Sequence, residues 1–238
     1  MLLKGGQICG DYLLAWNRGI LGAYVRLAGA DAFRLRHHTR YGKEHLVKVK
    51  KAFGQNPIWT LLDDDAGGDA EKWKTAPSLY LFTHACDRMR PISHGGTGVA
   101  IPSYTIPVTS EQKEKLYCWE RVYFYHDRIW LNCGALEIAS CREMASPDSS
   151  LSKQGRELCG IIEAATKRPT YYYLQRYWAR PKGEEKRKCP GCGGAWNTEW
   201  MGVPTRLFHQ FEFLCKNCRL VSHLGVSTDG GRYARIGE

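Results

Sequence analysis

The sequence predicts an α+β fold, with a larger mixed N-terminal domain that has a helical middle and a small cysteine-rich C-terminal ribbon. Three observations predict it: short apolar runs bounded by turn residues, a change to helical spacing after residue 110, and two Cys-x-x-Cys pairs near the C-terminus. The 238 residues, 43% hydrophobic and 24% charged, match the composition of globular chains. We place the domain boundary between residues 167 and 168, before a strand that leads into the ribbon.

The first part of the chain predicts one helix and two buried strands. The first fifty residues mix apolar runs with glycines and arginines and favour no single regular element, but 47–53 should close a basic helix before Gly54. The runs at 58–62 and 79–83 are typical of short buried strands, and the acidic stretch 63–69 between them predicts a surface loop. Prolines and glycines over 91–107 predict irregular or edge structure.

The middle of the chain predicts helices. Apolar residues recur at spacings mostly of three, four and seven, which indicates a helical segment over about 110–144, interrupted near His126 and Asp127. The residues of this face are Leu116, Trp119, Tyr123, Trp130, Cys133 and Leu136. The cluster at 146–150 is a turn with helix-capping residues, so a second helix should follow it and end before Pro169.

The segment 170–178 is dense in tyrosine and other strand-forming residues. Alternation places Tyr171 and Tyr173 on one face of this strand and Tyr172 and Leu174 on the other. One face must pack inward. The other could contact nucleic acid, a protein partner or the ribbon.

Four cysteines carry the strongest chemical signal in the chain. Cys189 and Cys192 form one Cys-x-x-Cys pair, and Cys215 and Cys218 form a second pair 22 residues later. Pairs of thiolates in tight turns are typical ligands of tetrahedral zinc, and the apolar segment between them could form a hairpin arm that brings the pairs together. We therefore expect one structural Zn²⁺, held by all four thiolates with no coordination position left for a substrate.

Positive charge is concentrated at the N-terminus. The chain carries a formal net charge of +10, and residues 1–51 contain ten basic residues against three acidic ones. Such a segment suits a polyanion or an acidic protein face. The candidate binding residues are the basic residues of this segment and of the region around the cysteines: Lys48, Lys50, Lys51, Arg176, Arg180, Lys186, Arg187, Lys188, Lys216 and Arg219.

The segment from about Leu79 to Ser222 resembles an uncharacterised bacterial family. The resemblance rests on the segment from Asp148 to Leu174, on Cys-Pro-Gly-Cys-Gly-Gly at 189–194, and on Cys-Lys-Asn-Cys-Arg-Leu-Val-Ser at 215–222. The family is described as zinc-ribbon-containing and nucleic-acid-binding, so the resemblance implies a zinc ribbon and a nucleic-acid partner. Relatives of this kind also occur among loci for polymorphic toxins, which implies neutralisation of a toxin as an alternative.

The expected function is non-catalytic binding of a macromolecule, with nucleic acid as the first partner to test. The alternative is an immunity protein that binds and neutralises a bacterial toxin. No nucleophile elbow, phosphate loop or dinucleotide fingerprint occurs, so we expect neither an enzyme nor a small-molecule substrate. With no apolar run of membrane length, no signal-peptide segment and cysteines suited to reduced thiols, we expect a cytoplasmic protein that does not enter a membrane.

Overall fold

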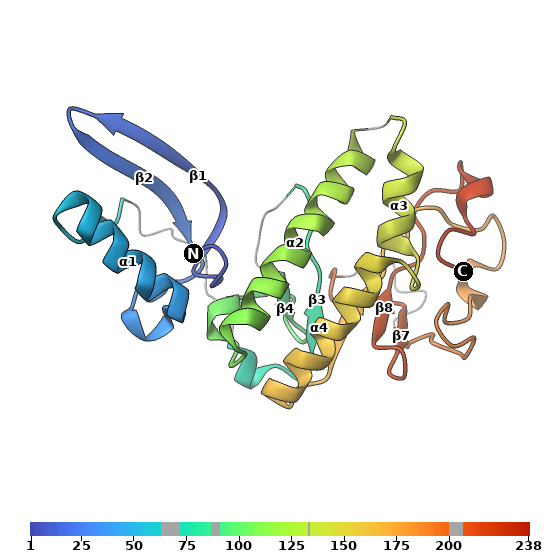
Figure 1. The fold of residues 1–238 in the computed structure, drawn as a ribbon. Coiled ribbons are helices and arrows are strands. Elements are labelled where there is room, and N and C mark those ends of the chain that lie inside the picture. The colour runs from blue at the N-terminus through green and yellow to red at the C-terminus, as the bar shows by residue number, and fades with distance from the viewer. Residues whose placement is uncertain (63–71, 87–90, 133, 200–206) are drawn as a thin grey trace.

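A computed structural model of the chain describes residues 1–62, 72–86, 91–132, 134–199 and 207–238. It is a mixed α+β structure, as the sequence predicts, with an N-terminal unit (residues 1–62) beside a larger body (residues 72–238) (Figure 1). The strands are β1 (Ile8–Asn17), β2 (Ile20–Leu27), β3 (Leu79–Leu81), β4 (Ile92–His94), β5 (Ala100–Ile101), β6 (Thr170–Tyr173), β7 (Phe213–Cys215) and β8 (Leu220–Ser222). The α-helices are α1 (Arg40–Phe53), α2 (Ser110–Leu131), α3 (Glu137–Ala145) and α4 (Ser150–Thr166).

The body is built on a six-stranded mixed sheet in the order β5-β4-β3-β6-β8-β7. Strand β6 pairs in parallel with both β3 and β8, and the other pairs are antiparallel. The sheet is therefore continuous from the edge strand β5 to the strands that carry the second cysteine pair. The division at residues 167 and 168 stays a prediction, because β6 belongs to the same sheet as the strands on both sides of it.

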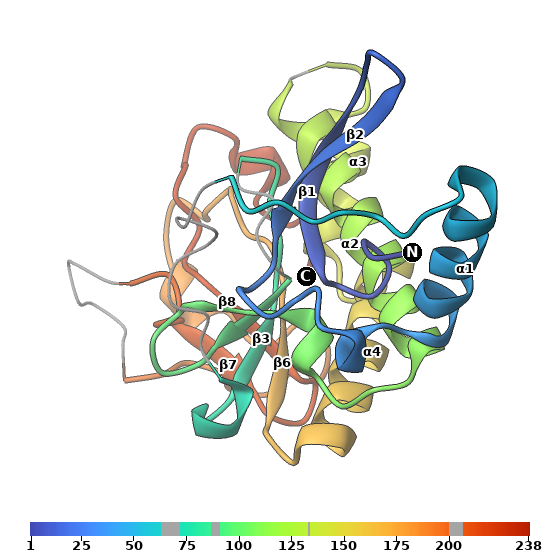
Figure 2. The same cartoon turned by 90° about the vertical axis from the view of Figure 1, so that its left-hand side faces the viewer.

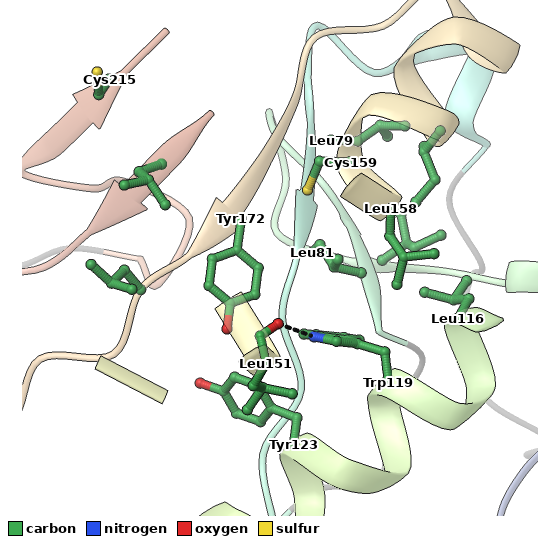
Figure 3. Close-up of a cluster of buried hydrophobic side chains, with 14 of the residues drawn as sticks. Leu79, Leu81, Leu116, Trp119, Tyr123, Leu151, Leu158, Cys159, Tyr172 and Cys215 are labelled. Carbon is green, nitrogen blue, oxygen red and sulfur yellow. Dashed lines mark hydrogen bonds between the residues drawn. The ribbon is translucent and has the colours of Figure 1, made fainter. Parts of the chain in front are cut away.

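Helices α2 and α4 cover one face of this sheet, and a capping residue fixes the start of each helix. Thr109 caps α2 in a reciprocal arrangement with Gln112, and the Ser149 hydroxyl accepts a hydrogen bond from the Ser152 amide at the start of α4. In the core between helices and sheet, the Trp119 indole donates to the Leu151 carbonyl at 3.2 Å, beside the rings of Tyr123 and Tyr172 (Figure 3). This core continues without a break to Cys189 and Cys215.

Three predicted features of the body need correction. The helical segment is not interrupted near His126, because Asp127 is buried within α2 and its carboxylate accepts a hydrogen bond from the Ala85 amide at 2.6 Å. The interruption lies between α2 and α3, where Leu136 is exposed rather than buried. The strand predicted at 170–178 is shorter in the structure, where it extends only over β6. Trp178 makes one isolated bridge to Ser227 beyond it. Cys133 and the predicted loop 63–69 lie outside the described residues.

Both faces of β6 are buried, as the alternation of its tyrosines allows. Tyr172 packs in the core beneath the helices, while Tyr171 and Tyr173 pack on the opposite face with Tyr80 and Phe211. Burial raises the pKa of all three β6 tyrosines above the ordinary value. The tyrosines of β6 are therefore core residues, whereas Tyr177 beyond the strand is exposed.

The N-terminal unit consists of the hairpin β1–β2 and helix α1. Arg18 and Gly19 join the two strands, both with positive φ, as a two-residue hairpin turn requires. Thr39 caps α1 and Gly54 ends it in the left-handed conformation, so the predicted basic helix is confirmed and begins earlier than residue 47. The predicted strand at 58–62 is wrong: this described segment is not a strand and Ile58 is 82% exposed.

Candidate metal centre

The two cysteine pairs lie in two tight turns, here called the first knuckle (189–194) and the second knuckle (215–219). The second knuckle connects β7 to β8, so the sheet itself positions Cys215 and Cys218. In the first knuckle, the Cys189 carbonyl accepts a hydrogen bond from the Gly193 amide at 2.7 Å. The residue after the second cysteine has positive φ in both turns, 71° at Gly193 and 52° at Arg219, so the two knuckles share one backbone geometry.

A short arm after the first knuckle brings it to the second. The Trp196 carbonyl accepts from the Leu214 amide at 2.6 Å, and the Trp196 ring stacks on Phe213 with centroids 4.8 Å apart. The Trp196 indole also donates to the Arg187 carbonyl at 3.0 Å. Because Trp196 is almost completely buried, this arm holds the first knuckle against β7.

The four sulfur atoms form one cluster, with all Sγ atoms within 4.8 Å of one another. The Cys192 and Cys215 Sγ atoms are 3.7 Å apart. A tetrahedral ion with metal–sulfur bonds of about 2.3 Å requires sulfur atoms about 3.8 Å apart, so the observed spacing fits such an ion. Four close cysteines can therefore bind one metal ion here, as the sequence spacing predicts.

The surroundings of the sulfur atoms act on the thiols in opposite directions, and burial raises the pKa of Cys218 well above its ordinary value. Burial raises the pKa of Cys189 to about 11, while the backbone amides of Gly191 and Cys192 act in the opposite direction. The Gly194 amide lowers the pKa of Cys192. Amides directed at sulfur stabilise the deprotonated form, and a bound cation would offset the cost of burying it.

Gly191 is required by the closeness of the two knuckles. A Cβ atom at this position would lie 2.8 Å from the Cys218 Sγ, a distance that side chains do not tolerate. A Cβ atom at Gly194 would lie 3.5 Å from the Cys192 Sγ, which is an ordinary contact. The sequence shows both glycines but does not distinguish them, because the contact with Cys218 exists only in the folded chain.

The predicted phosphate-binding residues fall in three separate places. Those of α1 are exposed: Lys48, Lys50 and Lys51. Lys216 is exposed on the second knuckle, but the neighbouring Arg219 forms a two-pronged ion pair with Glu163 of α4, with both N–O distances 3.1 Å. Helix α1 and the strands β7 and β8 lie at opposite sides of the molecule in Figure 1, so these cations do not form one surface.

The other five predicted binding residues surround a cavity next to the first knuckle: Arg176, Arg180, Lys186, Arg187 and Lys188. Several of them already have partners within the protein. Arg187 is buried and pairs with Glu184 and Glu238, and Arg180 also pairs with Glu238. Contact of any of the ten residues with nucleic acid stays a prediction.

The N-terminal unit carries an apolar surface that the sequence pattern does not predict. Residues that pair across the hairpin share a face, and one face consists only of apolar side chains, here called the apolar hairpin face. Its members are Tyr12, Leu14, Trp16, Leu21, Ala23 and Val25. The available signal was the Arg18–Gly19 turn between two apolar runs, but strands that are apolar on both faces lack the alternation of half-buried strands.

Two family models match segments of the body. Residues 74–175 match a domain of unknown function (DUF2310), and residues 179–228, which hold all four cysteines, match a second (DUF8594). Two proteins of Haemophilus influenzae, each described as an uncharacterized protein, are 34% identical to the chain over 167 residues. That match covers 69% of this chain, 80% of one relative and 62% of the other. The chain belongs to the DUF2310 family.

This membership agrees with the resemblance of the sequence to an uncharacterised bacterial family. The cysteine cluster is compatible with the zinc ribbon that the resemblance implies. The N-terminal unit precedes both matched regions. No solved structure matches the chain significantly. Among the helices that the structure describes, none is long and apolar enough to cross a membrane.

Proposed function

We propose that this chain is a non-catalytic binding protein whose N-terminal unit holds an acidic protein partner. The observation that carries the proposal is the apolar hairpin face, on which Leu14 is 58% exposed and Trp16 is 66% exposed. A two-stranded hairpin is marginally stable by itself, and a contiguous exposed apolar surface marks a site of interaction. The hairpin projects away from the body, and it lies nearest the viewer together with α1 in Figure 2.

The chemistry of this surface selects the kind of partner. Leu14, Leu21 and Val25 can neither stack on bases nor form hydrogen bonds, so the apolar hairpin face suits the apolar centre of a protein interface. Arg18 at the hairpin tip and the exposed lysines of α1 supply a positive rim, which favours an acidic partner and disfavours a basic one. An acidic bacterial toxin whose active site is covered by this surface fits these requirements.

Nucleic acid is the second candidate, and a specific observation supports it. Tyr12 and Trp16 are exposed on the same face of the hairpin, and α1 presents Lys48, Lys50 and Lys51 to solvent. Aromatic rings that stack on bases and lysines that contact phosphates are the usual elements of single-strand binding. The aliphatic residues between the aromatic ones are the reason why we rank this candidate second.

We further propose that the metal of the cysteine cluster is a single structural zinc ion. Tetrahedral sites with four thiolates select zinc or iron, and a mononuclear closed site in a ribbon is typical of zinc. When bound, the ion would crosslink the two knuckles and so stabilise the end of the sheet next to β6. The four thiolates would leave it no position for a substrate.

A pull-down from bacterial lysate, with and without nuclease, tests the binding role. The test variant is Leu14→Ser/Leu21→Ser, and its control is Val122→Ser/Leu131→Ser, which removes apolar side chains of similar exposure from α2. We expect the wild type and the control to capture one acidic protein with nuclease present, and the hairpin variant to lose it. Capture that disappears with nuclease and with Lys48→Glu/Lys50→Glu/Lys51→Glu would assign the role to nucleic acid instead.

A further inference from the structure

The cavity beside the first knuckle has the chemistry of an anion site. Its volume is about 430 Å³, and it is lined by five basic residues and one acidic residue, Glu238. The basic residues come from two segments that meet here, 176–180 and 186–188, so the fold concentrates charge that the sequence spreads over thirteen positions. Cavities of 300–1,000 Å³ are typical of small-molecule sites.

Arg176 is the least balanced of these cations. Its side chain is almost fully buried, with the residue 7% exposed, and its Nε and Nη1 atoms have no hydrogen-bond partner. Burial, together with the nearby charge of Arg187, lowers the pKa of Arg176 to about 10. A buried guanidinium without partners is costly, because it has lost water and gained no acceptor in return. Its position on the wall of the cavity indicates that an anion completes it.

The Glu238 side chain occupies the position between two of the guanidinium groups. Its Oε1 atom accepts hydrogen bonds from Arg180 Nε at 2.9 Å, from Arg180 Nη2 at 2.7 Å and from Arg187 Nη1 at 2.5 Å. Three N–H donors from two guanidinium groups thus converge on one carboxylate oxygen. A phosphoryl group offers three terminal oxygens in place of that one, and guanidinium groups bind such oxygens in pairs.

We propose that this cavity binds a small phosphate-bearing molecule, whose phosphoryl group displaces the Glu238 carboxylate from Arg180 and Arg187. Arg176 supplies further positive charge from the wall, and Lys186 and Lys188 are exposed at the rim. The proposal does not rest on the binding role of the N-terminal unit, which lies at the opposite side of the molecule. A concave site of this size suits a small molecule better than the extended backbone of a long nucleic acid.

Isothermal titration calorimetry tests the proposal. The full chain is titrated with inorganic phosphate and with pyrophosphate at constant ionic strength. We expect saturable binding of one pyrophosphate per chain. Arg180→Gln should weaken binding by about tenfold or more, since it removes two charge-assisted hydrogen bonds. Glu238→Gln should tighten binding several-fold, because it removes the competing carboxylate. Lys182→Gln is the matched control. Lys182 is exposed and lies between the two segments that line the cavity, so removing its charge should change the affinity by less than about twofold.

Three results would overturn the proposal. One is the absence of saturable binding by both the wild type and Glu238→Gln. Another is an equal loss of affinity in Arg180→Gln and Lys182→Gln, which would mean a diffuse charge effect. The third is Arg180-dependent binding of a single-stranded oligonucleotide that pyrophosphate does not displace, which would assign the cations to a nucleic-acid backbone. Circular dichroism checks the fold of each variant, and Lys186→Gln replaces Arg180→Gln if the latter does not fold.

Discussion

The ring of Tyr172 lies directly against the Cα of Gly155, so a Cβ at position 155 would come within 2.3 Å of the Tyr172 Cε2 atom. Helix α4 therefore approaches β6 more closely than any residue with a side chain would allow. The same Cβ would also lie 3.0 Å from the Trp119 indole nitrogen, so the surrounding core leaves no free space.

Gly155→Ala should destabilise the body by about 1–3 kcal/mol, because the added methyl group forces the tightly packed core apart. The matched control is Gly160→Ala in the same helix, where a Cβ meets nothing within 4 Å. The control should be stabilised by up to about 1 kcal/mol through helix propensity. Urea unfolding measures both, and equal effects at the two positions would contradict the close packing of α4 on β6.

Gly191→Ala should weaken metal binding by about 10–100-fold, the usual cost of disturbing the shell around metal ligands. The added methyl group would push the Cys218 sulfur away from the cluster. Gly194→Ala is the control, because its Cβ makes only an ordinary contact. Competition with a chromogenic zinc chelator gives both affinities. If both variants bound zinc as the wild type does, the close approach of the two knuckles would be wrong.

The attachment of the N-terminal unit should weaken in acid. The Tyr104 hydroxyl, His37 and Arg36 hold the pKa of Asp31 well below its ordinary value of 3.8. The hydrogen bond from Tyr104 to Asp31 is 2.5 Å long and links the body to the N-terminal unit. Because the folded-state pKa is lowered, the stabilisation is present above the unfolded-state pKa and is lost as the pH falls through the folded-state value.

Asp31→Asn measures this contribution. The wild type should be the more stable protein at about pH 7, and the difference should shrink as the pH falls below about 4. Urea unfolding of both proteins across this range gives the difference. A gap that stays constant down to about pH 3 would show that the Asp31 carboxylate does not stabilise the folded state.

The parts of the fold that sequence could predict are those with a local signal. The spacing of Cys189, Cys192, Cys215 and Cys218 predicts a cluster because tight turns bring paired thiols together, and the structure places all four within 4.8 Å. Likewise, the periodicity around Leu116, Trp119 and Tyr123 reports a buried helical face, since side chains at that spacing share one side of a helix.

The parts that sequence could not predict depend on distant contacts. The segment 58–62 has the composition of a buried strand, but a strand is buried only where another element covers it. Within the described chain no element covers Ile58, which stays exposed. Asp127 resembles a helix break, whereas the Ala85 amide, 42 residues away, satisfies its carboxylate inside α2. The ion pairs in the basic cavity likewise depend on a distant residue, because Glu238 lies more than fifty residues from Arg180 and Arg187 along the sequence.

We propose above all that the four cysteines hold one zinc ion that crosslinks the two knuckles. X-ray absorption at the zinc edge, combined with metal analysis of the purified full chain, tests it most directly. We expect one zinc per chain with four sulfur neighbours at about 2.3 Å. Folded protein without stoichiometric zinc, or zinc with nitrogen or oxygen neighbours in place of some sulfurs, would contradict it.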